Sequence, residues 1–412
     1  MKDYEWIIVG GGIAGVSIAE ILSRDNKSVL LLEKNDSLAS ETSKEFHEWF
    51  HSGTLHTLVP DNLLTLRYLL GATDDLLEYY RGFQSMNLEP TEAGLYVKEP
   101  GWFYNNYINY KYRIHKFNPV WMSMVSKSAN LTERVLNHDW LRRRAGAEYG
   151  SSQSNKSEWF DLISEQLMSS EKFKTIVSPD VTMNSRKLIS DMLSHAIENG
   201  VDVKTNEEVL SINEKANSVE VNTNQKCYQG SKIVICAPDL IAKSYDIPIK
   251  ESYAPMAIVE NLDPEQESFV ELDYYVTKCI NLLVKPGQIG QAGGISLSKE
   301  SKVNDYLEYL IKEHKKRSPQ IKVVDTYVGL KKELVQKGEG RNYLYHINNP
   351  SDSDKVWTVV LGKFSLAFSM APEFFRRVYK KNPKKSFKPS ISCSDKSLVS
   401  KTSWQEIIER YN

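Results

Sequence analysis

The stretch Trp6-Ile7-Ile8-Val9-Gly10-Gly11-Gly12-Ile13-Ala14-Gly15 decides the fold of this chain. Four apolar residues typical of a buried strand run directly into a glycine-rich turn. The spacing of Ala, Ile and Leu from Ile13 to Leu22 then predicts a helix. A second apolar run, residues 28–32, ends at Glu33. The order of strand, glycine turn, helix, strand and terminal acid indicates a dinucleotide-binding βαβ unit.

Each position of the turn has a physical role. Gly10 lets the chain turn sharply off the strand, Gly12 lets the backbone approach a pyrophosphate, and Gly15 lets the helix lie close to the sheet. The N-terminal end of the helix, which includes Ile13 and Ala14, directs free N–H groups toward the phosphates. These residues are therefore expected to bind the cofactor.

Glu33 indicates which dinucleotides fit. At the end of the second strand its carboxylate can accept hydrogen bonds from an adenosine ribose 2′-OH, and it would repel a 2′-phosphate. The motif alone does not separate FAD from NAD, so an NAD-dependent dehydrogenase is an alternative at this point.

Composition excludes several classes of protein. A chain of 412 residues with 41% hydrophobic residues predicts a globular protein of two to three domains. The net charge of −1 provides no general attraction to nucleic acid, and the basic runs lack interleaved aromatic residues. The four cysteines form no CxxC pair, so neither a zinc site nor a disulfide framework is indicated.

The distribution of apolar residues predicts the compartment. No run reaches the roughly twenty apolar residues that a transmembrane helix requires. The chain opens almost directly with the first strand, which leaves no room for a signal peptide. We therefore expect a cytoplasmic protein with no transmembrane segment.

Periodicity further along the chain predicts a return to the same sheet. Helices are expected at residues 63–80, in parts of 121–167, and at 185–199, 302–317 and about 370–379. Strands are expected in the aromatic-rich stretch 86–118 and at 201–204, 207–212, 218–222, 232–237, 257–259, 279–284 and 357–361.

Several stretches in this order resemble the FAD-dependent oxidoreductases of the D-amino-acid oxidase, glycine oxidase and 2-hydroxyglutarate/glycerol-3-phosphate dehydrogenase superfamily. They are IVGGGIAG (8–15), VTMNSRKLISDMLSHAIENGVDVKTNEEVLSI (181–212), IVICAP (233–238), VGLK (328–331) and LGKFSLAFSMAP (361–372). The resemblance implies an α/β fold with a Rossmann-like FAD-binding domain (GR2-type) and an antiparallel-sheet α+β substrate domain. The implied limits are 1–85, 150–245 and 326–380 for the FAD-binding domain, 86–149 and 246–325 for the substrate domain, and 381–412 for a basic C-terminal tail.

The resemblance implies FAD as the cofactor and adds further contacts to those of the glycine turn. A glycine turn feeding a helix at Gly362 places N–H donors where negative charge builds on the flavin N1/C2=O. The alternative for this element is a tight turn without a ligand. The additional cofactor-binding residues are expected to be Lys34, Ser43, Val209, Ala237, Gly362, Phe364 and Ser365.

His51, in His51-Ser52-Gly53, resembles a histidine that lies beside the isoalloxazine in the dehydrogenases of this superfamily. Such an imidazole accepts a proton from the substrate or orients it. The alternatives are that His51 packs under the flavin or is covalently linked to it. His47 and His56 are expected in a surface loop, and Gly53 argues against one helix presenting the three histidines to a metal.

Substrate binding is expected from His51, Lys331, Arg341 and Tyr345. Lys331 stands where many relatives have the arginine of Gly-Leu-Arg. A lysine cannot form the bidentate fork that arginine makes with a carboxylate. A plain amino-acid oxidase is therefore disfavoured, and a hydroxy-compound, a sugar-derived compound or a modified amine is favoured.

The sequence thus predicts a FAD-dependent dehydrogenase or oxidase. Its expected reaction moves a hydride from a CH–OH or CH–NH carbon of a small polar substrate, in some cases anionic, to flavin N5, with oxygen or another electron acceptor reoxidising the flavin. His51 and Lys331 are the catalytic candidates. Pro238 and Lys363 depart from the family pattern and favour the alternative, a flavin-binding structural or regulatory protein without its own turnover.

Overall fold

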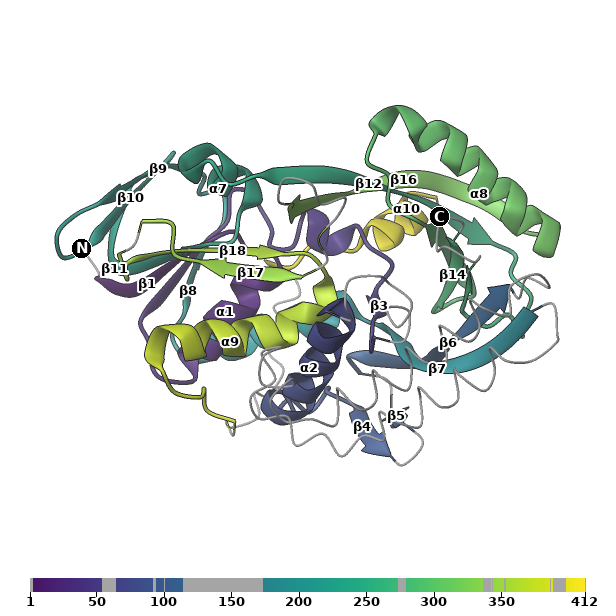
Figure 1. The fold of residues 1–412 in the computed structure, drawn as a ribbon, viewed down its shortest axis with the longest axis horizontal. Coiled ribbons are helices and arrows are strands. Elements are labelled where there is room, and N and C mark those ends of the chain that lie inside the picture. Colours follow the sequence, from purple (N-terminus) through teal and green to yellow (C-terminus); the bar gives the residue numbers. More distant parts are fainter. Residues whose placement is uncertain are drawn as a thin grey trace.

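The computed structural model describes residues 3–53, 64–91, 94–99, 101–113, 173–272, 279–335, 342, 344–351, 353–385, 387 and 398–411. These residues form two eight-stranded sheets and a two-stranded hairpin, which Figure 1 shows with their helices. No helix among these residues is long and apolar enough to cross a membrane.

The first sheet is built on the predicted βαβ unit. Its main path runs β17-β18-β11-β1-β2-β8, with all neighbours parallel except β17 and β18, and the hairpin β9-β10 extends from β11. The strands are β1 (Tyr4–Val9), β2 (Val29–Leu32), β8 (Asp202–Lys204), β9 (Val209–Glu214), β10 (Val219–Thr223), β11 (Cys227–Ile235), β17 (Tyr345–Asn348) and β18 (Val356–Leu361).

Both faces of this sheet are covered, as expected for parallel strands. Trp6 and Ile8 of β1 pack into the core of the helical face, whereas Ile7 and Val9 pack into a second core on the opposite face. The covering helices are α1 (Ile13–Ser23), α2 (Leu64–Tyr79), α6 (Ser185–Glu198) and α9 (Ala367–Tyr379) on the first face and α7 (Pro238–Tyr245) on the second.

The second sheet has the order β16-β12-β15-β14-β13-β6-β7-β3 and is antiparallel except for the pair β13-β6. Its strands are β3 (Trp49–Phe50), β6 (Phe103–Arg113), β7 (Phe173–Met183), β12 (Ile249–Glu260), β13 (Phe269–Leu272), β14 (Cys279–Lys285), β15 (Ile289–Gly294) and β16 (Lys322–Leu334). The separate hairpin consists of β4 (Leu88–Thr91) and β5 (Gly94–Val97).

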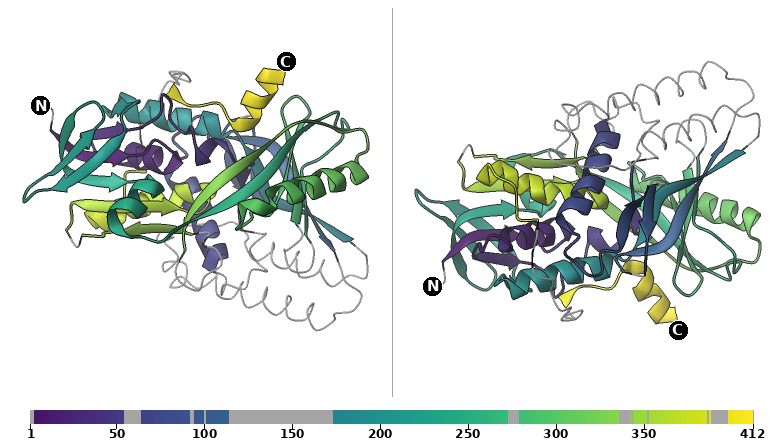
Figure 2. Two further views of the ribbon diagram at one scale, coloured as in Figure 1. Left: turned by 90° about the horizontal axis from the view of Figure 1, so that it is seen from above. Right: turned by 90° about the horizontal axis from the view of Figure 1, so that it is seen from below.

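Two helices lie on opposite faces of this second sheet. Leu310 of α8 (Val303–Arg317) shares a core with Ala257 and Val259 of β12, whereas Trp404 of α10 (Ser403–Tyr411) shares a core with the intervening Ile258. Figure 2 shows α10 and α8 on different sides of the long β12-β16 ribbon.

Most predicted elements are confirmed among the described residues, and three points need correction or restriction. The last family helix begins at Ala367 rather than near Met370 and contains Pro372. Strands β3, β7 and β16 pair in the second sheet, whereas the predicted limits of the first domain include β3, β7 and most of β16. The helices expected within 121–167 lie outside the described residues.

The C-terminal end differs from the predicted basic tail. Val399 forms a bridge with Leu38, and α10 buries Trp404 and Ile407 against the second sheet. The many Lys and Ser residues between 381 and 400 concealed this short amphipathic helix, whose apolar side chains are few. Residues 398–411 therefore form an ordered part of the fold.

His314 predicts how stability depends on pH. Burial on α8, with a smaller contribution from Arg317, lowers the pKa of this imidazole to about 4. Between pH 6.5 and 4 the unfolded chain binds a proton here that the folded chain does not. As the pH is lowered through this range, the free energy of unfolding should therefore fall, and His314 alone should contribute about 1.4 kcal/mol per pH unit. Urea denaturation at pH 7 and pH 5 tests this, with His314→Gln expected to reduce the loss; an equal loss in both proteins would contradict it.

Candidate functional site

A cavity lies between the two sheets, at the carboxyl ends of the parallel strands. Val9 ends β1, Glu33 follows β2, Cys236 follows β11 and Leu361 ends β18, and all four line the cavity. Ligands of open α/β sheets bind in this position, where strand ends meet helix N-termini. Residues of β16, of β7 and of the segment between β2 and β3 form the other walls.

The glycine turn forms a cradle on one wall. Gly10 has a φ of +103°, and a Cβ there would lie 3.2 Å from the carbonyl of Cys236. A Cβ on Gly15 would lie 1.9 Å from the carbonyl oxygen of Gly10, so the helix can approach the strand only without a side chain. Gly12 faces the cavity, and its Cβ would meet the Ser43 hydroxyl at 3.1 Å. Neighbouring backbone therefore excludes side chains at Gly10 and Gly15, whereas the space beside Gly12 is bordered by the Ser43 hydroxyl and is open to a ligand.

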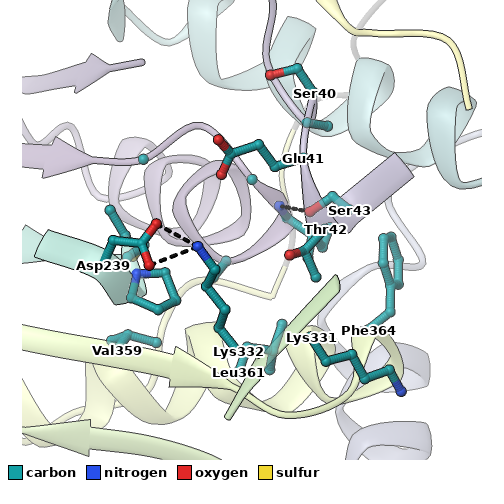
Figure 3. Close-up of a pocket in the computed structure, with 18 of the residues that line it drawn as sticks. Ser40, Glu41, Thr42, Ser43, Asp239, Lys331, Lys332, Val359, Leu361 and Phe364 are labelled. Carbon is teal, nitrogen blue, oxygen red and sulfur yellow. Dashed lines mark hydrogen bonds and ion pairs between the residues drawn. The ribbon is translucent and has the colours of Figure 1, made fainter. Parts of the chain in front are cut away.

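Hydrogen bonds fix this cradle in place. Ser43 Oγ accepts the N–H of Ile13 at 3.0 Å, as Figure 3 shows. The Glu33 carboxylate accepts the N–H of Gly11 at 2.7 Å and that of Asn35 at 2.9 Å. Glu33 is thus held at the cavity wall beside the cradle.

Two ion pairs flank the same part of the cavity. Lys34 Nζ lies 2.5 Å from Glu41, and this hydrogen bond raises the pKa of Lys34. Lys332 of β16 reaches Asp239 of α7 at 2.5 Å. Figure 3 shows that the neighbouring Lys331 points the opposite way along the cavity. The Nζ of Lys331 lies 4.7 Å from the centre of the Phe46 ring. The side chains of the adjacent Lys331 and Lys332 therefore point toward different ends of the cavity.

The end away from Glu33 contains the late glycine turn. Gly362 and Phe364 line the cavity, and α9 begins after a single 3-10 turn, Phe364–Leu366. Ser365 is fully buried, and its hydroxyl accepts the backbone N–H of His51 at 3.0 Å. This bond joins the late turn to the segment that carries His51.

His51 lines the cavity and lies beside a buried acid. Its ring stacks on Trp49 with 4.3 Å between ring centres, and its Nδ1 lies 3.8 Å from Oδ2 of Asp180. Asp180, on β7, accepts hydrogen bonds from the Trp49 indole, the Ser52 N–H and hydroxyl, and the Tyr110 hydroxyl. Burial raises the pKa of the Asp180 carboxyl, and these hydrogen bonds act in the opposite direction.

His47 lines the same end of the cavity, which contradicts its expected place in a surface loop. Its Nε2 is buried against Gly293, where a Cβ would come within 1.9 Å of it. Burial, with additional repulsion from Lys285, Lys331 and Lys363, lowers the pKa of His47 to about 3. The imidazole is therefore neutral at pH 7.

Glu48 connects the site to distant parts of the chain. Its backbone has a φ of +58°, a conformation that costs energy for a residue with a side chain. One carboxylate oxygen accepts the N–H and hydroxyl of Ser185, and the other binds Lys285 at 3.0 Å and the Trp404 indole at 2.8 Å. Helix α10 is thereby attached to the wall of the cavity.

Most of the residues predicted from the sequence come together here. Those that line the cavity are Gly10, Gly12, Ile13, Ala14, Glu33, Lys34, Ser43, His51, Val209, Ala237, Lys331, Gly362 and Phe364. Gly15 and Ser365 lie directly behind it. Tyr345 is a correction: its buried ring packs on Tyr68 in the core, 5.1 Å between centres, and not at the cavity. Arg341 lies outside the described residues.

Three further residues were not foreseen in this role: Glu48 and Lys363, which line the cavity, and Asp180, which lies beside His51. Asp180 is the one charged residue of the stretch TIVSPDVTM (175–183), and this is the sequence signal that could have identified it. Lys363 stood out only as a departure from the family pattern, and Glu48 carried no such signal. Among the described residues, no group of three or more His, Cys, Asp or Glu could hold a metal ion.

Comparisons of fold give proteins of one chemical class. L-alpha-glycerophosphate oxidase from Mycoplasma pneumoniae, with FAD bound, has a TM-score of 0.62 at 19% identity, covering 94% of this chain and 97% of that one. L-proline dehydrogenase from P. horikoshii has a TM-score of 0.61 at 13% identity, covering 93% and 95%. Glycine oxidase from Bacillus cereus has a TM-score of 0.60 at 14% identity, covering 92% and 96%. At such identities the likeness concerns the fold.

The sequence itself supplies the assignment to a family. No curated protein matches it. Residues 5–360, however, match the model of the family described as FAD dependent oxidoreductase. This match covers the glycine cradle and nearly all of both sheets, and it ends one residue before the end of β18. The chain therefore belongs to the FAD-dependent oxidoreductase family, and its cofactor is FAD.

Proposed function

We propose that this oxidoreductase removes a hydride from a CH–OH or CH–NH carbon of a small substrate with an anionic group, with oxygen or another acceptor completing the cycle. The observation that carries the proposal is the meeting of His51, Lys331, Lys363 and the Gly362 turn at one end of the cavity. A proton acceptor and two cations there suit an anionic compound that loses a hydride and a proton.

The cavity wall supports the expected orientation of the cofactor. Gly10, Gly12 and Ser43 would hold the diphosphate, because all three line the cavity and a Cβ on Gly12 would enter the space beside the Ser43 hydroxyl. Glu33 and Val209 would hold the adenosine, and Gly362 and Phe364 the flavin end. When bound, FAD supplies a hydride acceptor at N5 of its isoalloxazine.

The residues of the chain would then handle the proton and the charge. As a CH–OH group becomes C=O, its carbon gives up a hydride and its hydroxyl gives up a proton. His51 would accept that proton at Nε2, since Nδ1 faces Asp180. His47 is less suited to this task, because its pKa near 3 leaves it a weak base.

We also propose how the chain divides into domains. The first sheet with α1, α6 and α9 would form the FAD-binding domain, and the second sheet with α8 the substrate domain. Strand pairing supports assigning 173–183 and 322–334 to the substrate domain.

Replacing Lys331 by methionine is expected to raise the substrate KM by about 10-fold to 100-fold, because a charge-assisted hydrogen bond contributes about 1.5–3 kcal/mol. The value of kcat should change little if the contact is the same before and during reaction. Steady-state kinetics with the identified substrate measures both. Lys243→Met, which removes an exposed cation from the opposite part of the cavity, serves as the matched control. Equal KM values for wild type and Lys331→Met would exclude the role.

The visible spectrum of the FAD-loaded protein tests the proposed function. Pools of hydroxy acids, polyol phosphates, sugars and amines are added without oxygen, and loss of the flavin absorbance by one pool names the substrate class. We expect an anionic hydroxy compound to cause it. A stable flavin spectrum in all pools would support the alternative, a flavin-binding protein without its own turnover.

A further inference from the structure

Asp180 has an environment that suits an ionised carboxylate. The indole N–H of Trp49 and the backbone N–H of Ser52 each donate to a different oxygen of the group, both at 2.8 Å. The hydroxyls of Ser52 and Tyr110 also donate to it. An N–H group can only donate, so each oxygen acts as an acceptor. These hydrogen bonds favour the ionised form and oppose the effect of complete burial, which raises the pKa of this carboxyl.

His51 meets this carboxylate with one defined edge of its ring. Nδ1 is buried and lies 3.8 Å from Oδ2 of Asp180. Stacking on Trp49 fixes the plane of the ring, and the bond from the backbone N–H to Ser365 fixes the chain beneath it. The His51 side chain as a whole is 15% exposed and lines the cavity. Because Nδ1 is buried, Nε2 is the ring nitrogen available to a substrate. Catalytic hydrogen bonds are often long without substrate and shorten in the complex.

We infer that Asp180 is a positioning residue that holds His51 as the Nδ1–H tautomer, so that the unprotonated Nε2 faces the substrate. When Nε2 accepts the substrate hydroxyl proton, the resulting imidazolium lies against the carboxylate, which stabilises the positive charge without taking the proton itself. This inference rests on the proposed function of His51 as proton acceptor. It adds a residue from β7 to the substrate end of the site.

Other charges near His51 set the background for its titration. The cations Lys331 of β16 and Lys363 before α9 also line the cavity. Glu48, another lining residue, forms an ion pair with Lys285 at 3.0 Å. His47 is neutral at pH 7, and Tyr110 contacts Asp180 through a neutral hydroxyl. Asp180 lies within ion-pair distance of the ring, 3.8 Å from its Nδ1.

Nitrogen NMR of the FAD-loaded protein, labelled in its 8 histidines, tests the tautomer directly. The signal that disappears in His51→Asn identifies the residue. We expect a protonated Nδ1 and an unprotonated Nε2 above the titration midpoint. The opposite tautomer would overturn the inference, and this measurement needs no variant of Asp180 to fold.

The variant Asp180→Asn provides the second readout. Loss of the carboxylate should move the titration midpoint of His51 down by about one pH unit or more. Tyr110→Phe, which leaves that charge in place, should not lower the midpoint. An unchanged midpoint in a folded, FAD-bound Asp180→Asn protein would overturn the inference. If the tautomer is as expected but no substrate pool reduces the flavin, the proposed function is contradicted, whereas the positioning of His51 by Asp180 is supported.

Discussion

Replacing Gly12 by valine is expected to lower the affinity for FAD by about 100-fold, which corresponds to about 2.7 kcal/mol. The backbone of Gly12 is extended, with φ −71° and ψ −179°, so valine can adopt it without strain. A Cβ there meets only the movable Ser43 hydroxyl, at 3.1 Å. The side chain would instead occupy the space where the diphosphate must approach the backbone. The loss should therefore fall on the cofactor and not on the fold.

Titration of the apoprotein with FAD, followed by flavin fluorescence, measures this loss, and circular dichroism reports on the fold. Ala216→Val places the same side chain at an exposed turn outside the cavity and should bind FAD normally. Wild-type affinity in Gly12→Val would show that the diphosphate lies elsewhere. Gly15→Ala provides a contrast, because its Cβ would clash with backbone at 1.9 Å and should lower stability as well as affinity.

The FAD-binding half of the site could be predicted because its signals are local. Gly10 to Gly15 and Glu33 lie within one βαβ unit, and the meaning of each residue depends on neighbours a few positions away. The structure places the predicted members of this group at the cavity or, for Gly15, directly behind it. Periodicity likewise located α2 and α8 to within one residue at each end.

The substrate half could not be predicted to the same extent, because its contacts are distant in sequence. Ser52 and Asp180 are 128 positions apart, and only the pairing of β3 with β7 brings them together. A strand such as β17 has two faces, and alternation alone does not say which one meets the core. Tyr345 was therefore assigned to the wrong side. Glu48 adopts a positive φ that residue type would not suggest.

Replacing His51 by asparagine is expected to lower the rate of substrate oxidation by about 10²-fold to 10⁴-fold, the usual contribution of a general base. The backbone N–H of His51 is bonded to Ser365, just after the Gly362 turn, and its side chain lines the same cavity. The imidazole can accept a proton at Nε2, and asparagine cannot. FAD should remain bound, because the glycine cradle and Glu33 are untouched. Anaerobic reduction of the flavin, followed by stopped-flow absorbance, measures the rate separately from binding and from reoxidation.

The pH dependence of this rate identifies the base. In the wild type the rate should rise with pH as the imidazole of His51 loses its proton, and this rise should disappear in His51→Asn. The matched substitution is His47→Asn, in the same cavity. Because the pKa of His47 is already near 3, its removal should leave the rise with pH in place, even where the absolute rate changes. The opposite pattern would contradict this assignment. If the rise is lost in His47→Asn and retained in His51→Asn, the proton acceptor is His47, the imidazole buried against Gly293.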